Sequence, residues 1–233
     1  MCRTNLVESC MPRIARGVAV RYPHHIVQRG NNREKIFFHE EDKEKYLSLL
    51  KKYSEKWDTK ILAYCLMSNH VHLLAKPLEE VSLYKMMQGL TLCYTQYVNR
   101  TYERTGRLWE SRYHSCIVDK EKYLWAVARY IEQNPMRARI VSRAEEFSHS
   151  SARAHINRTK DDVLGEELFT EGQKRDYAKF VSSLGSEDEM KEIRYYTRTG
   201  RPLGSEQFIS KMEQKLQRRF TLKSPGRPKK KKG

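Results

Sequence analysis

The pattern of apolar and polar positions along the first half of the chain predicts strands that alternate with helices. Short apolar or alternating runs bounded by turn-forming residues predict strands at 24–29, 60–67, 70–76 and 112–118. Longer stretches with apolar residues at helical spacing predict helices at 41–57, 82–103 and 120–134. Ser68-Asn69 would form a tight turn, because asparagine tolerates positive φ, and Pro135 would stop the last helix.

This order of elements, βαββαβ, is the split-βαβ pattern. It predicts an α+β fold of the ferredoxin-like kind, with an antiparallel sheet and helices on one face. The other face of the sheet would then be available for a functional site. A C-terminal helical and basic extension would follow this body.

After Ser150 the periodicity weakens and the charge pattern changes. Residues 158–189 hold five basic and nine acidic residues, whereas residues 191–233 hold 14 Lys and Arg against 3 Asp and Glu. A helix is expected at 205–218 with Ser205 as its N-cap. The expected units are a disordered extension at 1–10 (Met11 is an alternative start), a main domain at 11–150, an acidic connecting segment at 151–190, a small helical module at 191–223 and a basic tail at 224–233.

The net charge of +16 lies mostly in the C-terminal arm and indicates a polyanionic partner, with nucleic acid the first candidate. The five cysteines contain no Cys-x-x-Cys pair, which argues against a zinc ribbon and a disulfide scaffold. No apolar run reaches the roughly 18 residues of a membrane helix. We therefore expect a cytoplasmic, nucleoid-associated protein that does not bind membranes.

His70 and His72 stand two apart on a predicted strand, so their side chains leave the same face. Two neutral imidazoles on one surface can chelate a divalent cation. His-x-His also occurs by chance, and the other reading is two packed or surface histidines. The apolar flanks of this pair favour the metal site, because unpaired imidazoles are poor choices inside an apolar hairpin.

Tyr130 and Asn134 are four apart on a predicted helix and share one face. Asn134 could offer a carbonyl oxygen as a third metal ligand, with the Tyr130 hydroxyl one turn away. On spacing alone, an ordinary tyrosine and an ordinary helix stop before proline are the better reading. Tyr123 is a rival nucleophile on the same helix, but its neighbour at the equivalent spacing is Val127, which cannot bind a metal.

Several separated motifs resemble a known family. Residues 67–74, Met-Ser-Asn-His-Val-His-Leu-Leu, resemble the His-hydrophobe-His signature of the HUH endonuclease superfamily. Residues 130–138, Tyr-Ile-Glu-Gln-Asn-Pro-Met-Arg-Ala, resemble the catalytic helix of its single-tyrosine transposases. Further matches to REP-associated tyrosine transposases lie, in the same order, at 11–13, 25–30 and 106–113. The resemblance covers 11–150, and Ser68 stands where the family more often has proline.

The resemblance implies a chemistry for the main domain. His70, His72 and Asn134 would hold Mg²⁺ or Mn²⁺ at the scissile phosphate of single-stranded or hairpin DNA. Tyr130 would attack that phosphate and form a 5′-phosphotyrosine, which a second transfer would resolve without ATP. Relatives in the superfamily include domain-swapped dimers, and the REP-associated branch implies a monomer.

Basic and aromatic side chains interleave where a single strand would bind, since phosphate contacts and base stacking act together. The candidate DNA-binding residues of the main domain are Arg29, Asn32, Arg33, Arg104, Arg107, Trp109 and Arg112. Trp109 is equally consistent with a core tryptophan. The C-terminal candidates are Arg198 and Arg201, with Arg227, Lys229 and Lys230 in a tail that resembles an AT-hook core.

Two other functions are consistent with parts of this pattern. The first is a DNA-binding regulator that keeps the fold and has lost cutting, which the intact set of His70, His72, Tyr130 and Asn134 argues against. The second is an RNA-processing or phosphoesterase enzyme that uses the histidines as acid and base. Such enzymes normally have a polar residue, such as Thr or Ser, after each histidine, and the leucines at 73 and 74 do not match that pattern.

Overall fold

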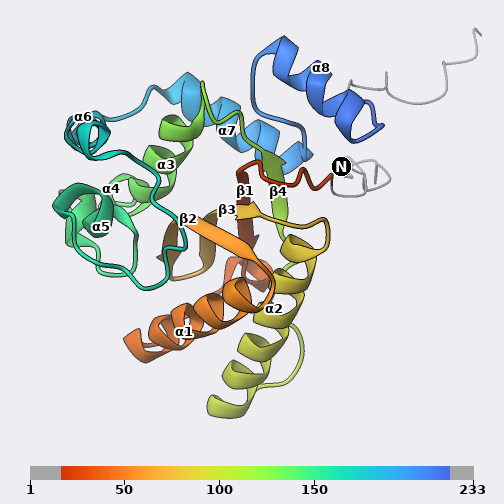
Figure 1. Cartoon of the computed structure of the whole chain (residues 1–233). Coiled ribbons are helices and arrows are strands. Elements are labelled where there is room, and N and C mark those ends of the chain that lie inside the picture. The colour runs from red at the N-terminus through yellow and green to blue at the C-terminus, as the bar shows by residue number, and fades with distance from the viewer. Residues whose placement is uncertain (1–16, 221–233) are drawn as a thin grey trace, which may run out of the picture.

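A computed structural model describes residues 17–220 and places a four-stranded antiparallel sheet at the centre of the protein (Figure 1). The strands are β1 (His24–Arg29), β2 (Thr59–Met67), β3 (His70–Pro77) and β4 (His114–Ile117). Their order across the sheet is β2-β3-β1-β4, so β3 lies between the two strands of the split βαβ unit. The predicted α+β, ferredoxin-like fold is confirmed.

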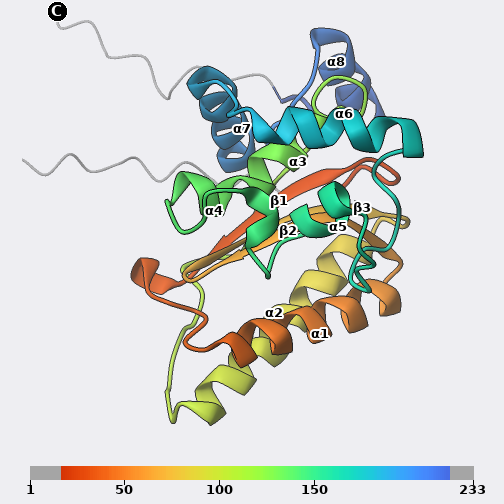
Figure 2. The ribbon, with the colours of Figure 1, turned by 90° about the vertical axis from the view of Figure 1, so that its left-hand side faces the viewer.

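One face of the sheet is covered by α1 (Glu40–Lys56) and α2 (Ser82–Thr101), which lie side by side beneath it (Figure 2). Strand side chains alternate between faces, so one residue in two along each strand points to these helices. The largest core of the protein forms here, with Ile26, Leu66, Leu73, Tyr46 and Tyr94 fully buried. This layer of two helices therefore supports β1 and β3 from the face of the sheet that it covers.

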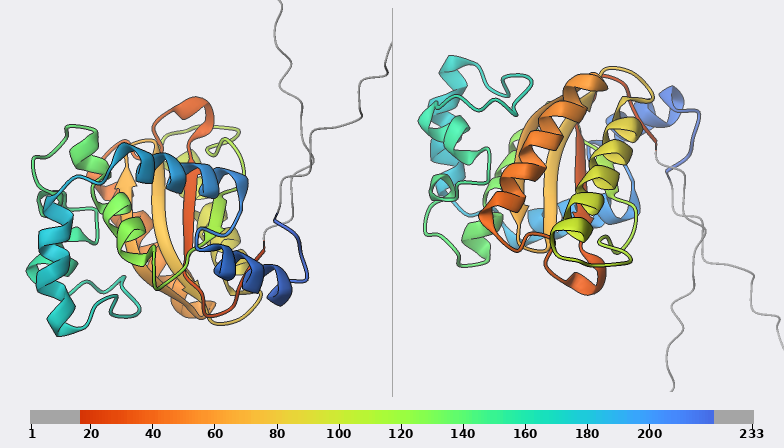
Figure 3. Two further views of the ribbon diagram at one scale, coloured as in Figure 1. Left: turned by 90° about the horizontal axis from the view of Figure 1, so that it is seen from above. Right: turned by 90° about the horizontal axis from the view of Figure 1, so that it is seen from below.

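The opposite face carries a second layer instead of being left bare. Helices α3 (Leu124–Glu132) and α7 (Glu187–Thr199) pack on this face, and α7 crosses the strands (Figure 3, left). The reason lies in the strands, because Cys65, Met67 and Leu74 also point to this face and are apolar. A sheet with apolar residues on both faces must be covered on both.

The predicted helix at 120–134 is wrong at both ends. Helix α3 begins at Leu124, and the chain bends at Gln133 before one further helical turn, α4 (Asn134–Arg137), with Pro135 in its first turn. Pro135 has no N–H for the Ile131 carbonyl, and the Asn134 Nδ2 donates to that oxygen at 3.1 Å instead. Proline at the start of a helix is tolerated, so it bends the chain here and does not stop it.

The chain after residue 150 is folded against the body. The segment predicted as an acidic connection contains α5 (Ala152–Asn157) and α6 (Glu171–Ser182), and α7 begins before the predicted boundary at 191. Two short 3₁₀ turns lie at Asn31–Arg33 and Ala144–Glu146. Helices α5, α6 and α7 supply buried residues to the second core.

The last helix, α8 (Glu206–Lys215), begins at the predicted N-cap, since the Ser205 side chain accepts from the Phe208 N–H. Phe208 and Met212 of α8 pack with Ala19 and Ile117 in a third, smaller core. The predicted extension at 1–10 and the tail residues Arg227, Lys229 and Lys230 lie outside the described residues. Within residues 17–220, no helix combines the length and apolar character needed to cross a membrane.

A buried polar network ties α3 to the segment after it. The side-chain oxygens of Glu132, which is fully buried, accept from Ser151 Oγ and His155 Nδ1 at 2.6 Å each and from Tyr177 Oη at 2.8 Å. These three donors come from around α5 and from α6. The network therefore fixes the α5–α6 region against the helix that carries Tyr130.

We expect Glu132→Ala to lower the free energy of unfolding by about 3–5 kcal/mol, because three buried donors lose their acceptor together. Urea denaturation measures this change. Glu121→Ala is the matched control, since Glu121 is exposed near the start of the same helix. Its effect should stay within about 0.5 kcal/mol, and equal losses in the two variants would contradict a stabilising role for the network.

Candidate active site

The two histidines of the predicted pair lie on β3, near the centre of the sheet, on the face covered by α3 and α7. His72 is opposite Val27 of β1 and Cys65 of β2, and His70 follows the turn at Ser68-Asn69. Their ring centroids are 5.0 Å apart and the ring planes are nearly perpendicular. His72 is 3% exposed, whereas His70 is only half-buried. The pair therefore presents one inner and one outer imidazole on a rigid strand.

Asn69 fixes the ring of His70. The Asn69 Nδ2 donates to the Arg33 carbonyl at 3.0 Å, which directs its Oδ1 to the His70 Nδ1 at 2.6 Å. An amide oxygen only accepts, so the His70 Nδ1 carries the proton. The Nε2 of His70 is then the nitrogen with a free lone pair.

His72 is held by a third histidine, His25 of β1. The His25 Nε2 and His72 Nδ1 are 3.1 Å apart, and the His25 Nδ1 is 2.7 Å from the Thr197 Oγ1 of α7. The two rings are within 8° of parallel with centroids 5.3 Å apart. That separation is close to the nitrogen–nitrogen distance plus both ring radii, so the rings lie edge to edge in one plane. The contact is a hydrogen bond, and it leaves the His72 Nε2 free.

All three imidazoles are neutral at physiological pH. Burial, with Arg29 nearby, lowers the pKa of His70 to about 4, and burial lowers the pKa of His25 to about 3. Burial also holds the pKa of His72 well below its usual value, helped by the charges of Arg137 and Arg29. Neutral imidazole is the form that binds metal ions.

Tyr130 of α3 lies against this group. Its ring meets the rings of His72 and His25 edge-on, each with a centroid distance of 5.6 Å. The guanidinium of Arg137 also lies over this ring, 4.4 Å from its centroid. Arg137 donates to the Tyr130 carbonyl at 2.5 Å, which ties α4 to α3. The predicted nucleophile thus contacts both a neutral imidazole group and a cation.

Asn134 lies one turn beyond Tyr130. Its Nδ2 donates to the carbonyls of Tyr130 and Ile131 at 3.0 and 3.1 Å. These bonds direct the amide nitrogen to the helix and leave the Oδ1 as the atom for a cation. Within residues 17–220, no three His, Cys, Asp or Glu side chains converge on a common metal position. The candidate ligands of a metal at this position are therefore the two histidines and the amide oxygen of Asn134.

The donor set fits a divalent cation. His70 and His72 each have a hydrogen-bonded Nδ1 and a free Nε2, which is the arrangement of metal-binding histidines. Two nitrogen ligands with an amide oxygen suit Mn²⁺, and Mg²⁺ less well.

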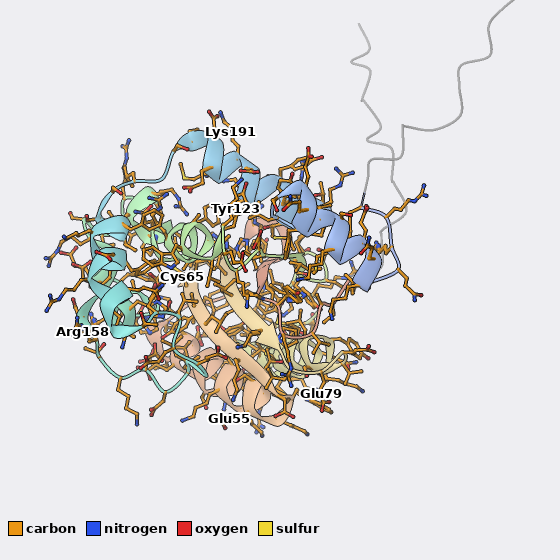
Figure 4. The ribbon with its side chains drawn as sticks, turned by 45° about the horizontal axis from the view of Figure 1, so that its top comes forward. Glu55, Cys65, Glu79, Tyr123, Arg158 and Lys191 are labelled. Carbon is orange, nitrogen blue, oxygen red and sulfur yellow. The ribbon has the colours of Figure 1, made fainter. Side chains whose placement is uncertain are left out.

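The rival nucleophile Tyr123 lies elsewhere. It is the N-cap residue of α3, beside α7 (Figure 4), and its hydroxyl donates to Glu192 Oε1 at 3.1 Å. Burial beside Glu192 raises its pKa to about 12. Seven residues of helix place it roughly 10 Å along the axis from Tyr130.

The site coincides with a family match. Residues 19–134 match the family model described as "Transposase IS200 like", which takes in both histidines of the pair, Tyr130 and Asn134. The chain belongs to the IS200-like transposase family. No curated protein sequence matches it.

The chain is also similar in fold to solved structures. One is a REP-associated tyrosine transposase bound to a REP hairpin, with a TM-score of 0.51 and 12% identity over 69% of this chain and 94% of that one. Another is a candidate transposase from Deinococcus radiodurans R1, with a TM-score of 0.36 and 16% identity over 55% of this chain and 92% of that one. The first supports the resemblance drawn from the motifs, at the level of the fold.

Exposed cations gather where β1 ends and β3 begins. Backbone hydrogen bonds join three segments there, from Gly30 to Asn69 (2.9 Å), from Asn31 to Leu108 (2.9 Å) and from Glu110 to Arg29 (3.0 Å). A Cβ on Gly30 would lie 2.3 Å from the Glu34 carbonyl oxygen, so only glycine allows this close approach. The exposed predicted DNA-binding residues on these segments are Arg29, Asn32, Arg33, Arg107 and Arg112.

Of the four other predicted DNA-binding residues that the structure describes, three have protein contacts. Arg104 is 3.8 Å from Glu34 and lies over the Phe38 ring. The Trp109 ring packs on Tyr46 and Tyr94, and its Nε1 donates to Thr95, so it is a core residue that anchors its loop. Arg198 is exposed near the end of α7, and Arg201 donates to the Tyr195 hydroxyl.

Four residues of the site were not assigned a role from the sequence. Arg137 lies seven residues, or two helical turns, after Tyr130, and that spacing was a usable signal. Asn69 and His25 were noted as parts of a turn, of a strand and of the family-like motifs at 67–74 and 25–30, without a role of their own. No pattern in the sequence points to Thr197, because only the packing of α7 brings it to His25.

Proposed function

We propose that this transposase is a metal-dependent endonuclease and strand-transferase that acts on single-stranded or hairpin DNA through a 5′-phosphotyrosine. The observation that carries the proposal is the edge contact of the Tyr130 ring with His72, on a strand whose two histidines each keep Nε2 free. The proposed nucleophile therefore lies against the face of the sheet that carries the two nitrogens proposed to bind the metal.

Tyr130 performs the covalent step. Its hydroxyl oxygen attacks the scissile phosphorus and loses its proton, and the bond from phosphorus to the 3′-oxygen breaks. The 3′-oxygen takes up a proton and leaves as a hydroxyl, while the 5′-phosphate stays on Tyr130. In the second transfer another 3′-hydroxyl attacks this phosphotyrosine and releases the tyrosine. One phosphodiester replaces another, so no external energy source is needed.

His70, His72 and Asn134 would hold the metal, through the two Nε2 atoms and the amide Oδ1. Mn²⁺ or Mg²⁺ bound there supplies charge neutralisation and orientation of the scissile phosphate. Asn69 keeps the His70 ring in the required orientation. The Asn134 Nδ2 donates to the Tyr130 carbonyl across the bend between α3 and α4, so the proposed third ligand is tied to the residue proposed as the nucleophile.

Arg137 favours the same chemistry through its charge. Its guanidinium lies over the Tyr130 ring, where it stabilises negative charge that develops on the phenolic oxygen during attack and departure. Arg29 lies at the outer end of the pair, where the phosphate backbone would enter, and is exposed. The site is therefore electropositive around neutral imidazoles, which suits a polyanionic substrate.

The exposed cations at the end of the sheet would bind the DNA that leads to the site. Arg29, Arg33 and the neutral Asn32 lie on one segment, and Arg107 and Arg112 lie on another that backbone hydrogen bonds join to it; phosphate contacts from such residues position a nucleic acid. A hairpin substrate is supported by the similar REP-associated transposase, which was solved with a REP hairpin. We further propose a monomer, located in the cytoplasm with nucleoid DNA.

A covalent-adduct assay tests the function. The full-length protein is incubated with Mn²⁺ and a labelled pool of hairpin oligonucleotides with single-stranded flanks, and then separated in SDS. We expect a labelled band that survives denaturation, whose cleaved DNA ends in a free 3′-hydroxyl. Tight hairpin binding with no adduct under any divalent cation would replace this proposal with a non-cleaving DNA-binding regulator.

The basic tail gives a separate prediction about affinity. Deleting residues 224–233 removes five Lys and Arg residues. We expect weaker DNA binding and a slope of log affinity against log salt that is smaller by up to ~3 to 4, at ~0.7 per phosphate contact on single strands. Fluorescence anisotropy at several salt concentrations measures it. An unchanged slope would leave the tail without a role in binding.

A further inference from the structure

The hydrogen-bonded chain behind His72 has a defined direction. The Thr197 hydroxyl has one proton, which it donates to the Ile193 carbonyl at 2.8 Å, as helical threonines commonly do. With that proton on the Ile193 carbonyl, the Thr197 Oγ1 accepts in its 2.7 Å bond with His25, which assigns the His25 proton to Nδ1. A neutral imidazole has one N–H, so the His25 Nε2 is an acceptor.

The same argument applies to His72, the proposed metal ligand. The His25 Nε2 accepts from the His72 Nδ1 at 3.1 Å, which places the proton of His72 on Nδ1. The His72 Nε2 then has its lone pair available. Both nitrogens of His25 are used within the protein, so His25 is not itself a ligand. This accounts for three neighbouring histidines that do not form a three-histidine metal site.

We propose that Thr197 and His25 are positioning residues that set the tautomer of His72 and so prepare its Nε2 for the metal. The proposal rests on the proposed metal site, and it adds α7 to the active site. Thr197 lies outside residues 19–134, the part that matches the family model. The C-terminal region thus supplies an element of the catalytic centre in addition to any contact with DNA.

Packing supports this assignment independently of the hydrogen bonds. Thr197 is 4% exposed and His25 is 1% exposed, so water does not compete for their polar atoms. A second contact, Cys116 Sγ to Thr197 Oγ1 at 3.4 Å, also fixes the hydroxyl from β4. Helix α7 makes its main contacts with β4 and also with β1, which carries His25. The threonine is therefore held at a fixed distance from His25 by the fold.

The test uses Thr197→Val, which keeps the shape of the side chain and removes the acceptor. Without it, the His25 proton is free to move to Nε2, which pushes the His72 proton onto its own Nε2, the ligand atom. We expect Mn²⁺ affinity of the full-length protein, without DNA, to fall about 10- to 100-fold. Electron paramagnetic resonance of free Mn²⁺ measures it. Nitrogen-15 NMR should show His72 protonated on Nδ1 in the wild type and at least partly on Nε2 in the variant.

Two further variants keep the test sharp. Thr197→Ser restores the hydroxyl and should return the wild-type tautomer and affinity. Thr199→Val is the matched control, because its hydroxyl bonds the Tyr195 carbonyl on the same helix, and it should change neither measurement. His25→Phe keeps a buried ring without nitrogens and should weaken Mn²⁺ binding as Thr197→Val does.

The outcomes separate this proposal from the function on which it rests. Wild-type Mn²⁺ binding with no loss in Thr197→Val, or an unchanged His72 tautomer in that variant, would overturn the role of Thr197. An equal loss of Mn²⁺ affinity in Thr197→Ser and in Thr197→Val would also overturn the role of Thr197. If the wild type itself did not bind Mn²⁺, the proposed metal site would be wrong, whereas the NMR tautomers would still decide the hydrogen-bonded chain.

Discussion

Tyr130→Phe is expected to abolish the covalent adduct with hairpin DNA and to lower cutting by about 10³-fold or more, since the attacking oxygen is absent. DNA binding should be retained, because the phenyl ring keeps its edge contacts with His72 and His25 and its place beneath Arg137. SDS gels of the labelled adduct measure the first effect, and fluorescence anisotropy measures the second.

Tyr123→Phe is the matched control for this experiment. Tyr123 belongs to the same helical segment, but its hydroxyl bonds Glu192 and its ring does not touch the histidines. Adduct formation should persist in this variant. An adduct in Tyr130→Phe as strong as in the wild type would show that another residue is the nucleophile, and a loss confined to Tyr123→Phe would identify it.

The fold was largely predictable because its strands and long helices are encoded by local periodicity. The strand at 24–29 and the turn at Ser68-Asn69 coincide with the structure. The start of α3 was not predictable, because it depends on a distant partner. The Asp119 N–H donates to the Leu203 carbonyl, and Asp119 then caps the turn through its bond from the Glu121 N–H. A local pattern contains no information about Leu203.

The candidate site can be divided in the same way. His70, His72 and Tyr130 could be predicted as site residues because their motifs are short and contiguous in sequence. Thr197 contacts a histidine 172 residues earlier in the chain, and a buried threonine in an amphipathic helix looks like any other core position. The second helical layer had a weaker signal, since apolar residues on both faces of β2 imply a cover but do not say which helix provides it.

His70→Ala is expected to remove the metal dependence of cutting while leaving hairpin binding close to that of the wild type. Loss of one of two nitrogen ligands removes several kcal/mol of charge stabilisation, which corresponds to a fall in rate of about 10²- to 10⁴-fold. His70 is a better choice than His72, because it is half-buried and its side chain is hydrogen-bonded to the adjacent Asn69, so the strand should tolerate alanine.

The control for this variant is His39→Asn, at an exposed histidine that precedes α1 and whose replacement can still cap that helix. It should cut at the wild-type rate with the same dependence on Mn²⁺ concentration. Undiminished cutting by His70→Ala would exclude the histidine pair as the metal site. The neighbouring cations Arg29 and Arg33 remain in His70→Ala, so DNA affinity should be kept if His70 acts only in the chemistry. Loss of both cutting and DNA binding would instead mean that His70 is part of the DNA-binding surface.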